Sequence, residues 1–235
     1  LTALASVAQA SDRPASGDLG EVTVTATLRE LPAAALPASV TVLGEETLRR
    51  AGTQHFEDLL GLVPNLSWSA ASSRPRYFQL RGIGELEQYE GAPNPSVGFL
   101  LDDVDFSGLG MVATLYDLER IEVLRGPQGT RYGANALGGL VYARSRAPEE
   151  RFDAGAELGA GDAGTRSVGA RVTGPVDALD SAFRLAVHHH ASDGPTRNAW
   201  LERDTAARDE LTARGRWRYS PTDALALDAS VLHAR

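Results

Sequence analysis

The last third of the chain alternates apolar and polar residues with a period of two. Five segments show this pattern, and the apolar positions of each share one face: Phe152, Ala154, Ala156, Leu158 and Ala160; Val168, Ala170 and Val172; Phe183, Leu185 and Val187; Leu211, Ala213, Gly215, Trp217 and Tyr219; Leu225, Leu227, Ala229 and Val231. Successive side chains of a strand point to opposite faces, so the pattern predicts five strands with one apolar face each. Such strands are typical of a transmembrane barrel, although a soluble β-sandwich has the same alternation.

The links between these segments differ in length. Residues 174–177 (Gly-Pro-Val-Asp) and 220–223 (Ser-Pro-Thr-Asp) predict short turns, whereas residues 191–209 form a long polar link. Transmembrane barrels have short turns on their inner side and longer loops outside. The first, third and fifth strands would then run outward, and Trp217 and Tyr219 would lie near the inner rim.

The preceding region mixes short helices with short strands. Residues 38–43 predict a strand, and residues 45–51 predict a helix that Gly52 closes. Thr53 is expected to cap a second helix. That helix would bury one face, formed by Phe56, Leu59, Leu60 and Val63, before Pro64 ends it.

Two further strands are predicted at residues 77–81 and 97–101, on either side of the polar segment 84–96. Asp102 and Asp103 then predict a tight hairpin turn, with Val104 and Phe106 on the returning strand. The pattern of this region favours an α+β domain with a small mixed sheet and short helices.

Residues 123–139, Val-Leu-Arg-Gly-Pro-Gln-Gly-Thr-Arg-Tyr-Gly-Ala-Asn-Ala-Leu-Gly-Gly, hold five glycines after an apolar run. Glycine lets main chain pass close to other main chain, so the segment predicts a tightly folded region. A phosphate-binding loop would need Lys followed by Ser or Thr after its last glycine. The chain has no lysine, and Leu140 and Val141 follow, so the pattern argues against a nucleotide site.

This segment resembles the signature of the plug domain of TonB-dependent outer-membrane receptors. Three other segments stand in the order that the family has: Glu21, Val22, Thr23, Val24, Thr25 and Ala26, similar to the TonB box; residues 79–84 (Gln-Leu-Arg-Gly-Ile-Gly); and residues 97–104 (Val-Gly-Phe-Leu-Leu-Asp-Asp-Val). The resemblance covers roughly residues 21–145 and implies a plug followed by an antiparallel barrel of 22 strands. The chain departs from the family after Gly139, where Tyr-Ala-Arg-Ser-Arg replaces the usual end in Thr-Lys.

The first 30 residues are expected to precede the folded part. Residues 1–10 are small and apolar and end in Ala-x-Ala, which predicts a signal peptide remnant, with a flexible alanine-rich terminus as the alternative. Since there is no initiator Met, we expect the chain to begin inside a longer precursor. Residues 11–30 read as a disordered periplasmic tail with one Val/Thr island. The resemblance implies that residues 21–26 bind TonB by adding a strand to its sheet; an edge strand of the plug is the alternative.

The remaining residues divide into a plug, 31–147, and the first five or so barrel strands, 148–235. A barrel of 22 strands needs about 400 residues at roughly 10 per strand plus turns, whereas 88 residues follow residue 147. Five strands cannot close a barrel and leave both sheet edges unpaired. We therefore expect an N-terminal fragment with an incomplete barrel that transports nothing alone.

Arg81 and Arg125 each follow a leucine at a strand end and precede a glycine. An arginine in this place is either solvated or paired with a carboxylate across an interface, which would use its planar fork. The resemblance implies that both anchor the plug to glutamates of the barrel wall, on strands beyond residue 235.

Composition excludes several classes of protein. The chain has no cysteine, hence no disulfide or thiol chemistry. Its formal charge of −8 argues against nucleic acid as a partner. It lacks a run of roughly 18 apolar residues, so no transmembrane helix is expected.

Two clusters of polar residues contain side chains that can bind metal ions. His188, His189 and His190 would lie on a strand, where the middle imidazole points away from the others, so a polar lumen rim is favoured over a metal site. Asp102, Asp103 and Asp105 could bind calcium, but a turn is favoured. No nucleophile motif is present, and we predict neither an enzyme nor a resident metal or cofactor.

The sequence thus predicts an outer-membrane receptor that imports a scarce nutrient with energy from TonB, its tail in the periplasm. The resemblance favours a ferric siderophore as cargo, ahead of haem, cobalamin and glycans, and implies contact with outer-membrane lipid. Charged and aromatic residues at the predicted plug apices are the candidate cargo contacts: Arg74, Arg76, Tyr77, Glu85, Glu87, Gln88 and Tyr89. A plug-like binding or signalling receptor without transport is the alternative.

Overall fold

The structure is a computed structural model that describes residues 23–25, 31–32, 38–69, 76–87, 94–108, 114–194, 196–222 and 225–235. Residues 1–36 and 37–235 are separate compact units. In the first, β1 (Thr23–Val24) pairs antiparallel with β2 (Leu31–Pro32), so that Val24 lies opposite Leu31. Most of the predicted signal peptide remnant and tail, residues 1–22 and 26–30, lies outside the described residues.

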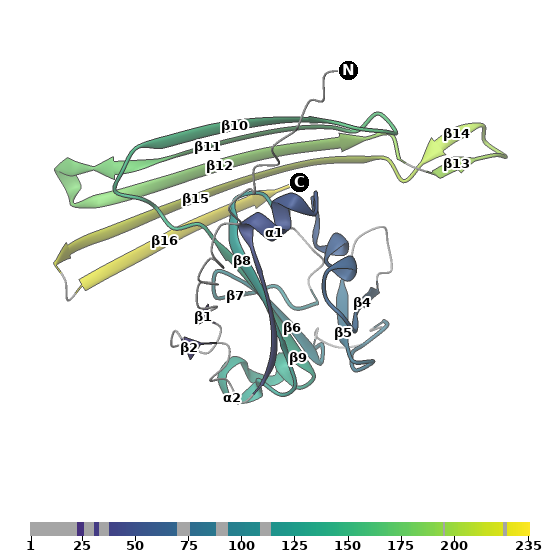
Figure 1. Cartoon of the computed structure of the whole chain (residues 1–235), viewed down its shortest axis with the longest axis horizontal. Coiled ribbons are helices and arrows are strands. Elements are labelled where there is room, and N and C mark those ends of the chain that lie inside the picture. Colours follow the sequence, from purple (N-terminus) through teal and green to yellow (C-terminus); the bar gives the residue numbers. More distant parts are fainter. Residues whose placement is uncertain are drawn as a thin grey trace, which may run out of the picture. The chain divides into compact units, whose positions relative to one another are not determined.

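The second unit begins with a globular part, residues 38–149, built on a sheet of order β3-β8-β9-β6-β7 (Figure 1). Its strands are β3 (Ser39–Gly44), β6 (Val97–Leu101), β7 (Val104–Asp105), β8 (Leu118–Arg125) and β9 (Gly139–Ser145). β6 and β9 are parallel and the other neighbours antiparallel. β4 (Leu66–Ser69) and β5 (Tyr77–Leu80) pair separately. The predicted small mixed sheet is confirmed.

The first helix follows its prediction and the second does not. α1 (Glu45–Arg50) ends where Gly52 takes φ +64° and donates its N–H to the carbonyl of Arg49. The second element is a 3-10 helix, η2 (Phe56–Gly61), capped by His55 rather than Thr53. The Thr53 hydroxyl donates instead to the carbonyl of Leu48.

The 3-10 geometry also changes the buried face of η2. Phe56 and Leu59 are fully buried, at a spacing of three residues, whereas Leu60 is 40% exposed. A 3-10 helix has three residues per turn, so the predicted spacing of four does not apply. The prediction that Leu60 lies in the core was therefore wrong.

The Asp102-Asp103 hairpin is confirmed. Both residues have positive φ, +49° and +66°, and Leu101 pairs with Val104 across them, as in a two-residue turn of type I′. α2 (Gly129–Tyr132) and η3 (Gly133–Ala136) then fold the glycine-rich segment.

Gly139 shows why this segment needs glycine. It has φ +154°, and a Cβ at this position would lie 2.5 Å from Leu80 Cδ1 and 2.6 Å from the carbonyl oxygen of Leu124. The close approach lets β9 enter the centre of the sheet. One core results: Leu43, Leu48, Phe56, Leu59, Val63, Leu66, Phe78, Leu80, Val97, Phe99, Leu101, Leu115, Leu118, Ile121, Val123, Val141 and Ala143.

The rest of the chain forms the long-strand sheet, five antiparallel strands that pair in sequence order (Figure 1). They are β10 (Asp153–Ala160), β11 (Arg166–Val176), β12 (Ser181–Ser192), β15 (Arg208–Thr222) and β16 (Leu225–Ala234). The predicted alternation is confirmed, most clearly in β12. Leu185 and Val187 are about half exposed, whereas Arg184 and His188 are buried.

The connections of this sheet differ from the prediction. β11 continues to Val176 and the chain turns only at η4 (Asp177–Leu179) and Asp180, which has φ +43°. β15 likewise runs on to Thr222. The predicted long link holds a hairpin of β13 (Thr196–Asn198) and β14 (Arg203–Thr205). In the described part of the chain, no helix is both long and apolar enough to cross a membrane.

Candidate functional site: contacts between the globular part and the long-strand sheet

Three arginines of β12 and β15 lie together on the polar face of the long-strand sheet. Arg184 is directly opposite Arg216, and Arg214 is opposite the next residue but one of β12, Ala186. Alternate residues of a strand share a face, so the three guanidinium groups are neighbours. Like charges placed this closely repel each other and therefore require acceptors.

Asp117 is the principal acceptor. Arg184 donates from Nε to Asp117 Oδ2 at 2.8 Å and from Nη2 to Oδ1 at 2.5 Å, and its Nη1 lies 3.3 Å from Glu149 Oε1. The two paired side chains are 2% and 3% exposed. Two parallel charge-assisted bonds in a dry site join β12 to the turn before β8, where Asp117 has φ +58°.

The other arginines bind main-chain carbonyls of the globular part. Arg214 Nη1 donates to the carbonyl of Tyr116 at 3.2 Å, and Arg216 Nη1 donates to the carbonyl of Ser145 at 2.9 Å. At the first residue of β15, Arg208 forms an ion pair with Glu57 of η2. The long-strand sheet thus supplies the cations, and the globular part supplies oxygen acceptors at the start of β8, the end of β9 and η2.

His188 belongs to the same contact. The sequence predicted that it lines a polar rim, but in the structure it is buried against the globular part. It is 3% exposed, its ring stacks on Tyr116 with centroids 5.0 Å apart, and its Nδ1 lies 3.2 Å from Thr114 Oγ1. Burial first, and then the nearby carboxylates of Glu157 and Asp117, raise the pKa of Tyr116 to about 12. The tyrosine therefore stays neutral and packs as an aromatic surface.

His189 points to the other face, as the alternation predicted. Its Nε2 lies 2.9 Å from Asp209 Oδ1, and its side chain is 39% exposed. Among the described residues, no group of three or more His, Cys, Asp or Glu side chains is placed to hold a metal.

The carboxylates of the acidic turn, Asp102, Asp103 and Asp105, accept hydrogen bonds from the globular part. The carboxylate of Asp102 accepts from the N–H and hydroxyl of Ser145 at 2.8 and 2.6 Å, and Asp103 accepts from the Tyr142 hydroxyl at 2.8 Å. Burial alone would raise the pKa of Asp105, but hydrogen bonds from Ser107 and Asn135 lower it. Each carboxylate has a separate partner, which supports the turn interpretation.

The predicted cargo residues are only partly brought together. Arg76 is exposed, and its Nε donates to the carbonyl of Gly108 at 3.0 Å. Its guanidinium lies 5.4 Å from the ring centre of Tyr77, which is only 3% exposed. The carboxylate of Glu85 accepts from the N–H and hydroxyl of Ser96. Glu87 is exposed, and Arg74, Gln88 and Tyr89 lie outside the described residues.

The predicted anchoring arginines are close enough to influence each other. Arg125 is 9% exposed, and its Nη2 donates to the carbonyl of Pro64 at 3.2 Å. Burial, and then the positive charge of Arg81, lower the pKa of Arg125. Arg81 is exposed and has φ +55°. Of the predicted TonB-binding residues, Thr23 and Val24 form β1, Thr25 follows, and Glu21, Val22 and Ala26 are not described.

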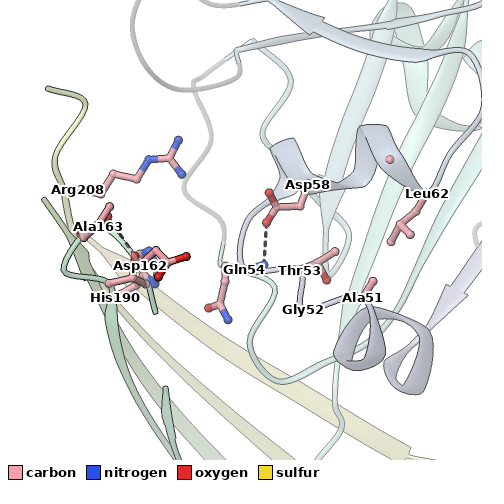
Figure 2. Close-up of a pocket in the computed structure, with 13 residues that line it drawn as sticks. Ala51, Gly52, Thr53, Gln54, Asp58, Leu62, Asp162, Ala163, His190 and Arg208 are labelled. Carbon is pink, nitrogen blue, oxygen red and sulfur yellow. Dashed lines mark hydrogen bonds between the residues drawn. The ribbon is translucent and has the colours of Figure 1, made fainter. Parts of the chain in front are cut away.

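A cavity of about 580 Å³ lies between the globular part and one end of the long-strand sheet. Figure 2 shows Gln54, Thr53 and Asp58 on one side of it and Asp162, His190 and Arg208 on the other. Asp58 caps η2 by accepting from the N–H of His55 at 3.0 Å, and it also accepts from the N–H of Gln54 at 2.8 Å. The cavity walls therefore carry both signs of charge beside apolar surface from Ala51, Leu62 and Ala163.

Asp117, Arg184, Arg214 and Arg216 are not among the site residues predicted from the sequence. One signal was present, because an arginine on the inner face of a strand needs a carboxylate or carbonyl partner. Alternation identified that inner face, but it contains no information about which distant residue lies against it.

Comparison with known proteins connects this geometry to a family. A family model described as TonB-dependent Receptor Plug Domain matches residues 32–140. The chain is 32% identical over 155 residues to the ferrioxamine B receptor of Salmonella typhimurium (strain LT2), covering 60% of this chain and 20% of that protein. It is 30% identical over 118 residues to the pesticin receptor of Yersinia pestis, covering 50% and 17%. The chain spans about a fifth of the length of these curated relatives.

Solved structures have the same fold. The pyoverdine outer membrane receptor FpvA from Pseudomonas aeruginosa PAO1, bound to pyoverdine, matches with a TM-score of 0.75 and 19% identity, over 93% of this chain and 31% of that chain. The ferric yersiniabactin uptake receptor FyuA from Yersinia pestis matches with a TM-score of 0.68 and 24% identity, over 81% and 30%.

Proposed function

We propose that residues 32–140, which match the family model of the TonB-dependent receptor plug domain, form such a plug, and that this chain is part of an outer-membrane receptor that imports a ferric siderophore. The observation that carries the proposal is the pairing of this plug with strands that turn apolar residues outward and bind the plug on their polar face. The named relatives supply the cargo class, because ferrioxamine B and pyoverdine are siderophores.

In this proposal the long strands are the beginning of a barrel in the outer membrane, and the N-terminal tail lies in the periplasm. TonB binds residues 21–26 and pulls on the plug. The domain limits are 1–10 for the signal peptide remnant, 11–30 for the tail, 31–147 for the plug and 148–235 for the barrel strands. The role is transport, not catalysis.

The direct test is uptake of iron. The complete receptor that carries this chain is expressed in a bacterium without siderophore receptors of its own, and iron-55 loaded on ferrioxamine B, pyoverdine and alcaligin is offered in turn. We expect uptake of at least one chelate that stops when TonB is deleted. Equal uptake with and without TonB would contradict the proposal.

Val24→Pro in the complete receptor is expected to abolish energised uptake while leaving cargo affinity within twofold. Proline fixes φ and removes the N–H that an added strand uses for pairing. Iron-55 uptake and equilibrium binding to whole cells measure the two quantities. Val24→Thr, which keeps the N–H and a β-branched side chain, is the matched control, and normal uptake by the proline variant would rule out residues 21–26 as the TonB-binding strand.

Arg74→Ala combined with Arg76→Ala is expected to weaken cargo binding about tenfold or more, since guanidinium groups suit an anionic chelate and Arg76 is exposed. Tyr77→Phe is the comparison, because Tyr77 is buried and the variant keeps its ring. Binding is measured by titration of the purified receptor with the ferric chelate that it imports. An affinity within twofold of the unmodified receptor would remove these arginines from the site.

A further inference from the structure

Five polar side chains form a cluster beside the two segments that contain most of the predicted cargo residues. The first segment, residues 70–76, links β4 to β5, and the second, residues 86–95, links Glu85 to Ser96. The members of the cluster flank these segments in the described part of the chain: Ser67, Ser69, Gln79, Glu85 and Ser96. Hydrogen bonds within this Gln79 cluster therefore connect the bases of the two segments.

Gln79 is the centre of the cluster. It lies on β5 directly opposite Ser67 of β4 and is 5% exposed. Its Oε1 accepts from the Ser67 hydroxyl at 3.0 Å, and its Nε2 donates to Ser69 Oγ at 2.9 Å and to the carbonyl of Glu85 at 2.5 Å. The Ser69 hydroxyl also donates to that carbonyl, at 3.1 Å. These bonds join the β4-β5 hairpin (Figure 1) to the beginning of the second segment.

The chain reverses immediately after β5. Leu80 and Ile83 exchange two main-chain hydrogen bonds, of 2.9 and 3.0 Å. The two residues between them, Arg81 and Gly82, both have positive φ, +55° and +77°, as in a two-residue turn of type I′. This turn brings the main chain of Glu85 back beside the buried amide of β5.

Glu85 also closes the second segment at its base. Its Oε2 accepts from the N–H of Ser96 at 2.7 Å, and its Oε1 accepts from the Ser96 hydroxyl at 2.6 Å. The two residues are 11 positions apart, so one side chain joins the beginning and the end of the segment. Ser96 leads directly into β6, and its carbonyl accepts from the N–H of Gly138 at 2.7 Å. The base of the segment is therefore fixed to the central sheet as well as to the β4-β5 hairpin.

We propose that Glu85 is a positioning residue for cargo binding: together with Gln79 it holds the two segments in the arrangement that binds the chelate, and it does not contact the cargo. This inference rests on the proposed function and gives Glu85 a different role from the one predicted from the sequence. Both carboxylate oxygens accept from Ser96, and a negative charge facing an anionic chelate would repel it. Segments that are held in place before binding lose less conformational entropy when the chelate binds.

A positioning residue and a direct cargo contact differ in the rate constant that they control. Without the carboxylate, only a fraction of the receptors has the binding arrangement at any moment, and the apparent affinity falls by that fraction. Bound cargo keeps its own contacts, so the association rate constant falls and the dissociation rate constant does not rise. Loss of a direct contact has the opposite effect, because most changes at a binding surface act on dissociation.

Glu85→Ala and Glu85→Gln in the complete receptor separate position from charge. Glutamine has the length of glutamate, and its amide can accept from the N–H of Ser96 and donate to the Ser96 hydroxyl. We expect Glu85→Ala to lower the association rate constant about tenfold or more, with dissociation within twofold. Glu85→Gln should keep both rate constants within twofold. Stopped-flow fluorescence of the purified receptor measures them with ferric ferrioxamine B, pyoverdine or alcaligin, whichever it imports.

Glu46→Ala is the matched control, because Glu46 is another carboxylate of the globular part, with a side chain that is 65% exposed. Its loss should change neither rate constant. Equal losses in Glu85→Ala and Glu85→Gln would overturn the proposal, because binding would then need the charge. Faster dissociation from Glu85→Ala with unchanged association would also overturn it, since Glu85 would then be a direct cargo contact.

Ser96→Ala is a milder second variant, which removes the hydroxyl donor and keeps the N–H. It should lower the association rate constant by a smaller factor than Glu85→Ala does. Adding Ser96→Ala to Glu85→Ala should cause no further loss, because the two residues act through the same contact. Losses that add in the double variant would overturn the proposal.

Hydrogen exchange tests the same contact without cargo. In the unliganded receptor, the N–H of Ser96 should exchange about tenfold or more faster in Glu85→Ala than in the unmodified protein, whereas Glu85→Gln should match the unmodified protein. Mass spectrometry of overlapping peptides locates the change. Equal exchange in all three proteins would overturn the positioning role. If the unmodified receptor imports none of the three chelates, the proposed function fails, and the exchange rates still decide whether Glu85 fixes Ser96.

Discussion

Arg184→Ala is expected to destabilise the attachment of the plug by about 3–5 kcal/mol, the usual cost of removing one partner of a buried ion pair. Asp117 is 3% exposed, so the variant leaves its carboxylate without water and without its bidentate partner. The carboxylate must then be buried unpaired or take up a proton. The contact between β12 and the start of β8 should loosen.

Opening of the plug in urea measures this effect. Ala143→Cys, at a fully buried position of β9, is introduced as a reporter in the complete receptor, made otherwise free of cysteine, and its labelling rate is followed against urea concentration. Arg218→Ala is the matched control on β15, because Arg218 and Asp228 form a partly exposed pair, with side chains 36% and 44% exposed, worth about 1 kcal/mol at most. Equal shifts for the two variants would show that the Arg184 pair does not hold the plug.

A compensating pair tests the physical cause. Arg184→Met combined with Asp117→Asn should regain most of the loss, because no buried charge then lacks a partner. Asparagine suits position 117, where φ is +58°, since it tolerates the left-handed region better than most residues. If the double variant is as unstable as Arg184→Ala, lost packing rather than an unpaired charge is responsible.

The sequence predicts those parts of the fold that depend on neighbouring residues. Alternation with a period of two places Leu185 and Val187 outward and Arg184 inward, and the structure agrees. The Asp102-Asp103 turn follows because aspartate accepts positive φ at both central positions of a two-residue hairpin. Each of these features depends only on residues that are close together in the sequence.

Local patterns are less informative where two similar arrangements compete. Phe56, Leu59 and Val63 suit either an α-helix or a 3-10 helix, and the structure has the tighter form, in which the N–H of Asp58 donates to the carbonyl of His55, three residues earlier. The turn after β11 lies later in the chain than predicted, because Pro175 is still paired with Ala182 in the sheet. Such boundaries depend on the partner strand as well as on the turn residues.

The candidate site depends on contacts that no local pattern describes. Arg184 and Asp117 are 67 residues apart in the chain, and the strand pattern shows only that Arg184 faces inward. The family resemblance implies that arginines of the plug bind carboxylates of the wall. The described residues contain the opposite arrangement, in which arginines of the strands bind Asp117, Glu57 and main-chain carbonyls of the plug.

Arg81→Ala combined with Arg125→Ala is expected to change the stability of the 235-residue chain little and that of the plug in the complete receptor much more. In the described part of the chain, neither arginine forms an ion pair, and Arg125 donates to the carbonyl of Pro64. Losing one bond from a charged donor costs about 1.5–3 kcal/mol. Burial and then repulsion from Arg81 lower the pKa of Arg125, and removing this buried charge offsets part of the cost.

In the complete receptor, two adjacent guanidinium groups at strand ends would have carboxylates of later strands as partners, and losing both pairs should release that side of the plug. Passive entry of bulky antibiotics into cells should then rise severalfold, and Arg125→Lys, which keeps the charge without the planar fork, should have an intermediate effect. Thermal unfolding of the 235-residue chain in detergent is the companion measurement. A loss of stability in that chain as large as that of Arg184→Ala would mean that Arg81 and Arg125 brace the plug internally, because no later strand is present there to be lost.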